Sequence, residues 1–221
     1  MSITNYSELQ AALPEWMIRP GDSTVTAQAP DYITLCEARL NYGAGEPGDQ
    51  FYSPPLRVNQ MLTRSTASLS SEYVAVPDDF LEVRTFKVNT NPETKLYYST
   101  PDQFAEAGSS QSSGVPKTFT IAGDEFRFGP APSSDLTAEL WYYAKIPALS
   151  DSNTSNWLLA AAPNIYLYGS LLEAALAIGD DAGAQKWLGL FSSAVKAFQA
   201  QDKRAKHGST PLVMRPVTQT P

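Results

Sequence analysis

The sequence predicts an α+β fold, a helical bundle formed by N- and C-terminal helices with an inserted antiparallel β module. Apolar residues recur at helical spacing near both ends of the chain, whereas the middle shows the two-residue period of strands. Each helical group has an apolar stripe that is buried only if the other group covers it. We therefore expect N-terminal bundle helices over 1–54, the β module over 55–150, C-terminal bundle helices over 151–207 and an extended tail over 208–221.

Composition limits the class of protein. The 221 residues suit one domain, or a core domain with a small inserted module, and 43% apolar residues are enough for a core. No apolar run approaches the ~18 residues that span a bilayer, and residues 1–5 lack the zones of a secretory signal, so we expect a soluble, non-exported protein. A net charge of −7 argues against broad electrostatic binding of nucleic acid.

Cysteine and histidine occur once each, as Cys36 and His207. The chain therefore cannot form an internal disulfide and lacks the ligands of the usual structural zinc site. We expect a reducing compartment, no cofactor and no metal. Helical spacing places Cys36 on the core face as a small hydrophobe rather than a reactive thiol.

Two helices are expected in the first region. Asn5 and Glu8 fit a capping arrangement at the start of the first helix. Pro14 should end or kink this helix at the preceding residue. Pro30 stands where a second helix would begin, and a glycine-rich stretch over 42–48 stops it.

The middle region has the pattern of strands joined by turns. Strands are expected over 56–69, 72–76, 80–88, 95–98, 117–123, 125–128 and 136–146, with a turn over 77–80, a short helix over 101–106 and a flexible loop over 108–114. The clearest hairpin turns at 123–124 and places on shared faces Phe119, Ile121, Phe126 and Phe128. The last strand has large residues on both faces, which indicates that it is sandwiched or buried in an interface.

Two helices are expected after a polar link, over 157–179 and 181–207, either separate or continuous with a bend. Gly179 suits the end of one helix and Asp181 the start of the next. A basic cluster complements the helix dipole at the C-terminal end of the second helix. The remaining residues, 208–221, contain three prolines and one apolar cluster.

Motifs that carry chemistry are weak. His207 is expected to be exposed at the end of a basic helix, where it is a poor base for a hydrolase triad. No dinucleotide-binding or phosphate-binding glycine motif occurs. The acidic pairs at 78–79 and 180–181 fit turn and cap roles, and Glu173 is expected at the margin of an apolar stripe, paired with a surface or neighbouring-subunit cation. We therefore expect no enzyme.

A series of short motifs occurs in order between residues 77 and 187. They are Pro77-Asp-Asp-Phe-Leu-Glu82, Tyr98-Ser-Thr-Pro-Asp-Gln103, Gly114-Val-Pro116, Gly123-Asp124, Phe128-Gly-Pro130, Leu140-Trp-Tyr-Tyr143, Ile146-Pro147, Asn156-Trp-Leu-Leu159, Pro163, Tyr166-Leu-Tyr168, Leu171-Leu-Glu-Ala174, Asp180-Asp181 and Trp187. Together they resemble the head-tail adaptor, or head-completion, proteins of tailed bacteriophages. The second helix is less typical, because a glycine-rich loop follows its residues 37–39 in place of further basic helix.

The resemblance implies a structural role at the neck of the virion, in a protein made in the host cytoplasm. Such proteins form a ring, commonly of twelve subunits, beneath the portal protein. The ring prolongs the DNA channel without sequence-specific binding and presents a platform to a tail, nozzle or tail-tube protein. A ring uses two different faces of each subunit, which agrees with a β module that is apolar on both faces. An acidic chain suits a channel wall along which DNA slides.

Two contact regions are expected. A portal or neighbouring-subunit contact would use Leu212, Val213, Met214, Arg215, Lys203, Arg204 and Lys206. A subunit or tail interface would use Trp141, Tyr143, Phe126 and Phe128. Two alternatives stay open: an aromatic-surface ligand-binding module or small enzyme that uses the strand over 140–143, and a tail-side gatekeeper or tail-tube protein.

Overall fold

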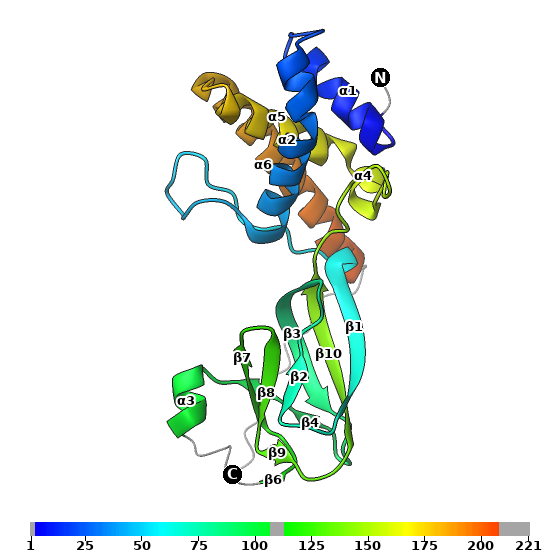
Figure 1. The fold of residues 1–221 in the computed structure, drawn as a ribbon, viewed down its shortest axis with the longest axis vertical. Coiled ribbons are helices and arrows are strands. Elements are labelled where there is room, and N and C mark those ends of the chain that lie inside the picture. The colour runs from blue at the N-terminus through cyan, green and yellow to red at the C-terminus, as the bar shows by residue number, and fades with distance from the viewer. Residues whose placement is uncertain (1–2, 107–112, 208–221) are drawn as a thin grey trace. The chain divides into compact units, whose positions relative to one another are not determined.

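A computed structural model of the chain describes residues 3–106 and 113–207. These residues fall into two compact units, a helical unit formed by Met1–Val58 with Ile146–Pro221 and a β unit formed by Asn59–Lys145 (Figure 1). The chain thus leaves the helical unit once and returns to it once. Helices and mainly antiparallel sheets occur together, which confirms the α+β class expected from the sequence.

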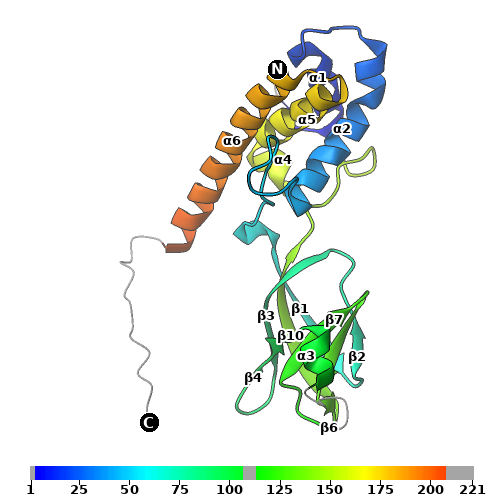
Figure 2. The same cartoon turned by 90° about the vertical axis from the view of Figure 1, so that its left-hand side faces the viewer.

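The helical unit is built around one central helix. Its members are α1 (Tyr6–Trp16), α2 (Ser23–Tyr42), α4 (Trp157–Ala161), α5 (Pro163–Ala177) and α6 (Asp181–His207). Helix α5 contacts each of the other four and lies between α2 and α6 (Figure 2). It is apolar around most of its circumference, as expected for a helix that is covered on all sides.

Side-chain caps set the starts of α1 and α2. Asn5 Oδ1 accepts a hydrogen bond from the Glu8 N–H at 2.9 Å, so the predicted capping arrangement is confirmed. At α2 the cap is Asp22, whose Oδ1 accepts from two backbone N–H groups of the first turn. This cap starts α2 at Ser23, so the predicted start at Pro30 was wrong and this proline lies inside the helix.

Two other predicted helix boundaries were also wrong, and each lies at a proline. Helix α1 continues through Pro14 to Trp16, because the missing N–H of a proline removes only one bond from its last turns. The predicted helix over 157–179 is divided at Ala162, whose φ of −148° and ψ of 68° are not helical. Pro163 is then the first residue of α5, a position where a proline loses nothing because its N–H would have no partner.

A glycine allows α5 to approach its neighbours closely. A Cβ added at Gly169 would lie 2.3 Å from Cys36 Sγ and 3.1 Å from the Phe191 ring. Cys36 is fully buried, which confirms its predicted core position. Burial raises the pKa of its thiol, so Cys36 stays protonated and serves as a packing residue.

The β unit contains two four-stranded sheets and a small third pair. The first sheet has the order β1 (Leu62–Leu69), β10 (Leu136–Ala144), β3 (Phe80–Val88) and β4 (Thr94–Lys95). The second has the order β2 (Tyr73–Ala75), β8 (Glu125–Gly129), β7 (Thr118–Ala122) and β5 (Tyr97–Tyr98). The parallel pair is β6 (Ser113–Gly114) with β9 (Ala131–Pro132), and the short helices are η1 (Asn59–Met61) and α3 (Pro101–Glu106).

Phenylalanine rings join the two large sheets. The β7–β8 hairpin turns at Gly123, as predicted, and it pairs Phe119 with Phe128. From the other sheet, Phe86 meets Phe119, Phe126 and Phe128 edge-to-face at centroid distances of 5.2, 5.2 and 5.4 Å. The two sheets therefore share one aromatic core.

Candidate interaction surfaces

The last turns of α2 hold the segment that leads out of the helical unit. Arg39 donates from Nη1 to the Phe51 carbonyl oxygen at 2.9 Å and to Ser53 Oγ at 3.2 Å. The backbone N–H of Leu56 donates to the Leu40 carbonyl oxygen at 2.8 Å. These hydrogen bonds satisfy polar groups of an irregular segment, which would otherwise lack a hydrogen-bond partner within the protein.

The same helix holds the returning segment. Asn41 Oδ1 accepts from the Ile146 N–H at 3.0 Å, and Glu37 Oε1 accepts from the Leu149 N–H at 2.8 Å. Glu37 Oε1 also accepts from the Tyr166 hydroxyl at 3.1 Å. Burial raises the pKa of the Glu37 carboxyl, and these two donated hydrogen bonds only partly offset that effect.

A buried ion pair ties α2 to α5. Arg39 Nε donates to Glu173 Oε1, and the two side chains are only 7% and 10% exposed. The expectation that Glu173 lies at a margin and meets a surface or neighbouring-subunit cation was therefore wrong. Its partner comes from a distant part of the same chain, so spacing along the sequence could not reveal it.

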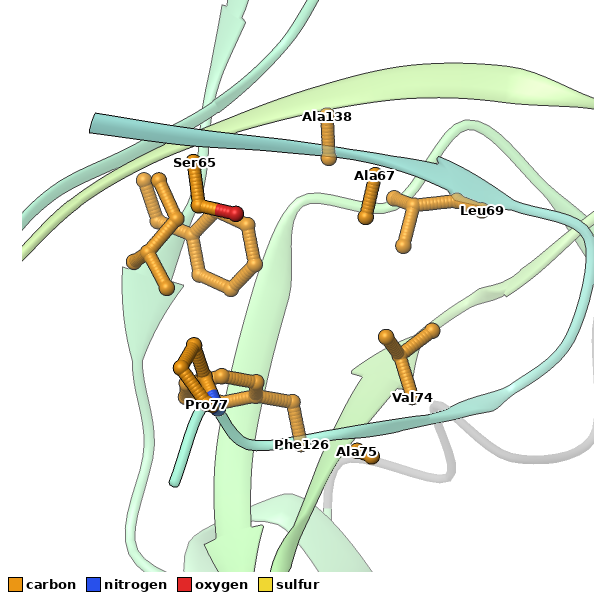
Figure 3. Close-up of a pocket in the computed structure, with 10 residues that line it drawn as sticks. Ser65, Ala67, Leu69, Val74, Ala75, Pro77, Phe126 and Ala138 are labelled. Carbon is orange, nitrogen blue, oxygen red and sulfur yellow. The ribbon is translucent and has the colours of Figure 1, made fainter. Parts of the chain in front are cut away.

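The β unit has a small cavity beside its ring cluster. A cavity of about 40 Å³ lies between the sheets, where Ser65, Leu69, Val74 and Phe126 line it (Figure 3). Ligand sites in proteins measure about 300 Å³ or more, so this space is a packing gap.

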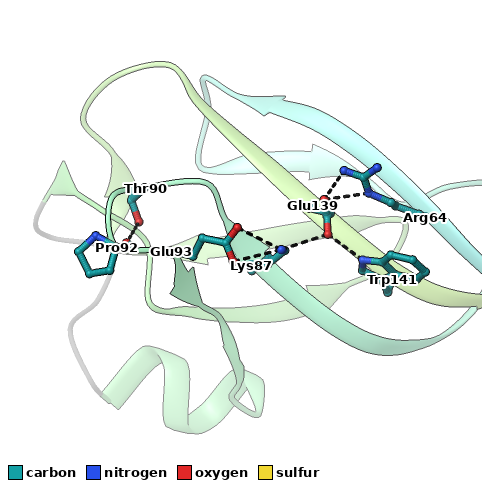
Figure 4. Close-up of polar contacts among 7 residues, drawn as sticks. All are labelled: Arg64, Lys87, Thr90, Pro92, Glu93, Glu139 and Trp141. Carbon is teal, nitrogen blue, oxygen red and sulfur yellow. Dashed lines mark hydrogen bonds and ion pairs between the residues drawn. The ribbon is translucent and has the colours of Figure 1, made fainter.

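On the outer face of the first sheet, Glu139 is the centre of a polar network (Figure 4). Its Oε2 accepts from Arg64 Nε at 2.8 Å, and its Oε1 accepts from Trp141 Nε1 at 2.8 Å and from Lys87 Nζ at 3.3 Å. The hydrogen bonds from Trp141 and Arg64 lower the pKa of the Glu139 carboxyl to about 2. The network holds the Trp141 indole on the sheet surface.

A shallow basin of about 380 Å³ surrounds this indole, and its lining includes Leu62, Arg84, Lys87 and Trp141. Tyr143 follows on the same face of β10, where it pairs in register with Leu62. The cations reach Trp141 from neighbouring strands. Sequence reasoning therefore missed them, because it looked for Lys and Arg beside the aromatic residues within one strand.

The four predicted interface aromatics separate into two groups. Trp141 and Tyr143 are half-buried and face outward, whereas Phe126 and Phe128 are 2% and 0% exposed in the shared core. The hairpin alternation correctly put both phenylalanines on one face, but that face packs on Phe86 of the opposite sheet. Phe126 and Phe128 therefore lie in the core of the β unit and are not exposed to a partner.

Within residues 3–106 and 113–207 there is neither a metal-binding cluster nor a membrane-spanning helix. No group of three or more His, Cys, Asp or Glu side chains is placed to hold a metal ion. No helix in this part of the chain is both long and apolar enough to cross a bilayer.

A model of the protein family described as SU10 adaptor protein matches residues 4–215. The chain belongs to the SU10 adaptor protein family. This is a phage head-tail adaptor family, which confirms the resemblance seen in the sequence. The chain is thus a bacteriophage adaptor, a structural component of the virion that works with portal and tail proteins. No match was found among curated proteins.

The basic cluster of this SU10-family adaptor lies at the end of α6. Lys203 and Arg204 are exposed there. The side chain of Lys206 and the whole of Leu212, Val213, Met214 and Arg215 lie outside the described residues.

The helical unit of the adaptor has an apolar surface that sequence reasoning missed. Trp16, Ile18 and Ile178 are 46%, 88% and 39% exposed and line one basin of about 240 Å³. Trp16 is the last residue of α1, Ile178 follows the last residue of α5, and Ile18 lies two residues after the end of α1. Nothing in the sequence placed these two helix ends side by side.

Proposed function

We propose that this adaptor assembles into a ring of twelve subunits that binds below the portal, extends the DNA channel and provides the platform to which the tail attaches. Family membership supplies the class of protein. The observation that supports the ring is that each unit has an outward apolar surface of its own, around Trp141 in the β unit and around Ile18 in the helical unit.

A closed ring needs two different surfaces on every subunit, because each subunit meets one neighbour with one face and the other neighbour with a second face. Large aromatic and aliphatic side chains exposed in patches are typical of such contacts. The Trp141 surface combines an oriented indole with the exposed Arg84, which suits a partner that offers a carboxylate beside apolar groups.

A contact with the portal or with a neighbouring subunit is proposed for Leu212, Val213, Met214 and Arg215 together with Lys203, Arg204 and Lys206. The Trp141 and Tyr143 surface is proposed as a subunit interface or as the platform for a tail, nozzle or tail-tube protein. A net charge of −7 favours a channel wall that repels DNA weakly and binds no particular sequence.

Mixing the purified adaptor with purified portal rings, and measuring the mass of the product by analytical ultracentrifugation, tests the proposal. We expect a complex with a fixed number of adaptors for each portal ring. Trp141→Ala should reduce binding of tail protein to this complex, whereas Tyr98→Ala, which alters an exposed aromatic residue of the second sheet, should not. Deletion of 208–221 should leave a folded protein that no longer binds portal.

Other results would favour the alternatives. Assembly with tail protein in the absence of portal, and no complex with portal, would identify a tail-side gatekeeper or tube protein. Saturable binding of a small molecule that is lost in Trp141→Ala would instead identify a ligand-binding module.

A further inference from the structure

Helices α1 and α5 end in the same hydrogen-bonded motif. At the end of α5, the Gly179 N–H donates to the Leu176 carbonyl oxygen at 3.2 Å and the Asp180 N–H donates to the Ala175 carbonyl oxygen at 2.9 Å. Gly179 has the left-handed φ of 73° that this motif requires. Glycine is favoured there because it has no Cβ to clash in that conformation.

At the end of α1 the equivalent residue is Ile18. Its N–H donates to the Glu15 carbonyl oxygen at 3.1 Å, and the Arg19 N–H donates to the Pro14 carbonyl oxygen at 2.9 Å. Ile18 has a φ of 58° and, among the described residues, is the one non-glycine residue with a positive φ. A β-branched side chain is strained in this conformation.

Folding does not explain the isoleucine. Its side chain is 88% exposed, so it contributes almost nothing to the core, and a glycine would complete the motif without strain. A strained residue with an exposed apolar side chain is instead typical of a binding site.

The basin beside Ile18 has an aromatic floor. Trp16 meets the Trp187 ring edge-to-face at a centroid distance of 6.4 Å, and Ile178 and Met17 complete the apolar lining. The two cations at this site already have partners, since Arg19 pairs with Asp22 at 3.9 Å and Lys186 lies over the Trp187 ring at 4.6 Å. Asp180 adds an exposed carboxylate to the lining, and its Oδ1 also accepts a hydrogen bond from the Gly183 N–H at 2.9 Å.

We propose that this basin binds the segment Leu212-Val213-Met214 of a second copy of the chain. Residues 208–221 are otherwise rich in proline and threonine, so this triplet is their one cluster of large apolar side chains. Arg215 follows it directly and matches the carboxylate of Asp180 at the basin. The inference rests on the proposed ring, because it names one contact between neighbouring subunits.

The length of the chain excludes that a subunit's own Leu212-Val213-Met214 segment fills its own basin. Helix α6 rises about 30 Å between Trp187, at the basin, and His207, at its end, at 1.5 Å per residue. From His207 to Met214 a fully extended chain spans at most about 25 Å. A subunit therefore cannot fill its own basin, and the contact joins two copies.

A synthetic peptide of residues 208–221, labelled with a fluorophore, tests the contact without portal. The receptor is the full-length Leu212→Ser/Met214→Ser variant, whose own segment does not compete. We expect saturable binding in fluorescence anisotropy, and a change in tryptophan emission because Trp16 and Trp187 lie at the basin. Adding Ile18→Gly should weaken binding at least tenfold, although the receptor becomes easier to fold. Leu190→Ala, which removes another 39% exposed apolar side chain of the same unit, should leave binding unchanged.

Absence of saturable binding, or equal binding by the Ile18→Gly receptor, would overturn the inference. Binding of a peptide in which Leu212, Val213 and Met214 are serine would also overturn it. These results are independent of the portal experiment. A peptide that binds only to portal rings would support the proposed function and contradict this neighbour contact. A peptide that binds the receptor, in a protein that forms no complex with portal, would support the neighbour contact and contradict the proposed function.

Discussion

Arg39 of α2 and Glu173 of α5 form an ion pair that is almost completely buried at the contact between the two helices. Arg39 additionally donates to two groups of the segment that leads toward the β unit. One guanidinium therefore joins three parts of the helical unit. A charge in such a position is stabilised only as long as its partners are present.

Removing one partner should be strongly destabilising. We expect Glu173→Ala to lower the free energy of unfolding by about 3 kcal/mol, because the Arg39 charge stays buried without its carboxylate. Urea unfolding at pH 7 measures this. The double variant Arg39→Met/Glu173→Leu should recover much of the loss, and a double variant as unstable as the single one would contradict this account.

Close packing at Gly169 makes a second prediction. Gly169→Ala should destabilise the protein by about 1–3 kcal/mol, since its Cβ would lie 2.3 Å from Cys36 Sγ. Gly189→Ala in α6 is the matched control, because nothing lies within 4 Å of its added Cβ. It should stabilise the helix by about 0.5–1 kcal/mol. Thermal unfolding of both variants decides whether steric contact or helix propensity dominates at Gly169.

The exposed Ile18 predicts a substitution that stabilises the fold. Ile18→Gly should raise the free energy of unfolding by about 1 kcal/mol, because it relieves a left-handed β-branched residue and removes no core contact. Gly179→Ala, at the equivalent position of α5, should lower it by a similar amount. If both variants lose stability in urea unfolding, Ile18 contributes to folding and the strain argument fails.

The buried Glu37 predicts a loss of stability as the pH rises. Its pKa is raised above the ordinary carboxyl value of 4.5, so the folded state binds this proton more tightly than the unfolded state. The stabilisation is complete below about 4.5 and is lost as the pH rises through the folded pKa. Glu37→Gln keeps an oxygen that accepts hydrogen bonds from the Leu149 N–H and the Tyr166 hydroxyl. This variant should be more stable than the wild type at pH values above the folded-state pKa of Glu37. Melting temperatures of both proteins, measured across pH 4–8, would contradict this if they change in parallel with pH.

Glu139 predicts the opposite pH dependence. Its pKa of about 2 means that its contribution to stability is present above 4.5 and is lost as the pH falls toward 2. Glu139→Gln should remove this part of the acid sensitivity. It should also shift the emission of Trp141, whose indole N–H loses a charged acceptor. Glu93→Gln is the control, because Glu93 contacts Lys87 and not the indole.

Local signals in the sequence predicted much of the secondary structure. The strand over Phe80–Val88 and the helix over Pro101–Glu106 have the predicted bounds, and the hairpin at Gly123 forms as expected. In each case, residues close along the chain carry the signal. Proline was the main source of error, because Pro14 and Pro30 lie within helices that capping and tertiary packing sustain.

The interaction surfaces were harder to predict than the elements. The predicted alternation put Trp141 and Tyr143 on one face of β10, and that face is the outward one, but the arginines and lysine around Trp141 come from other strands. The Ile18 basin requires knowledge of a backbone angle and of two helix ends that meet in space. Neither is encoded in the spacing of residues.

The two polypeptide crossings that connect the helical unit with the β unit are both bonded to the last turns of α2, through Arg39 on the outgoing side and Glu37 and Asn41 on the returning side. In mechanical terms, the two segments that lead to and from the β unit are each held by hydrogen bonds to the same helix of the helical unit. A pulling force on the β unit is therefore divided between two sets of hydrogen bonds that must break together. Bonds that are loaded in parallel resist a pulling force better than bonds that open one at a time, so α2 would hold both segments when the β unit is pulled.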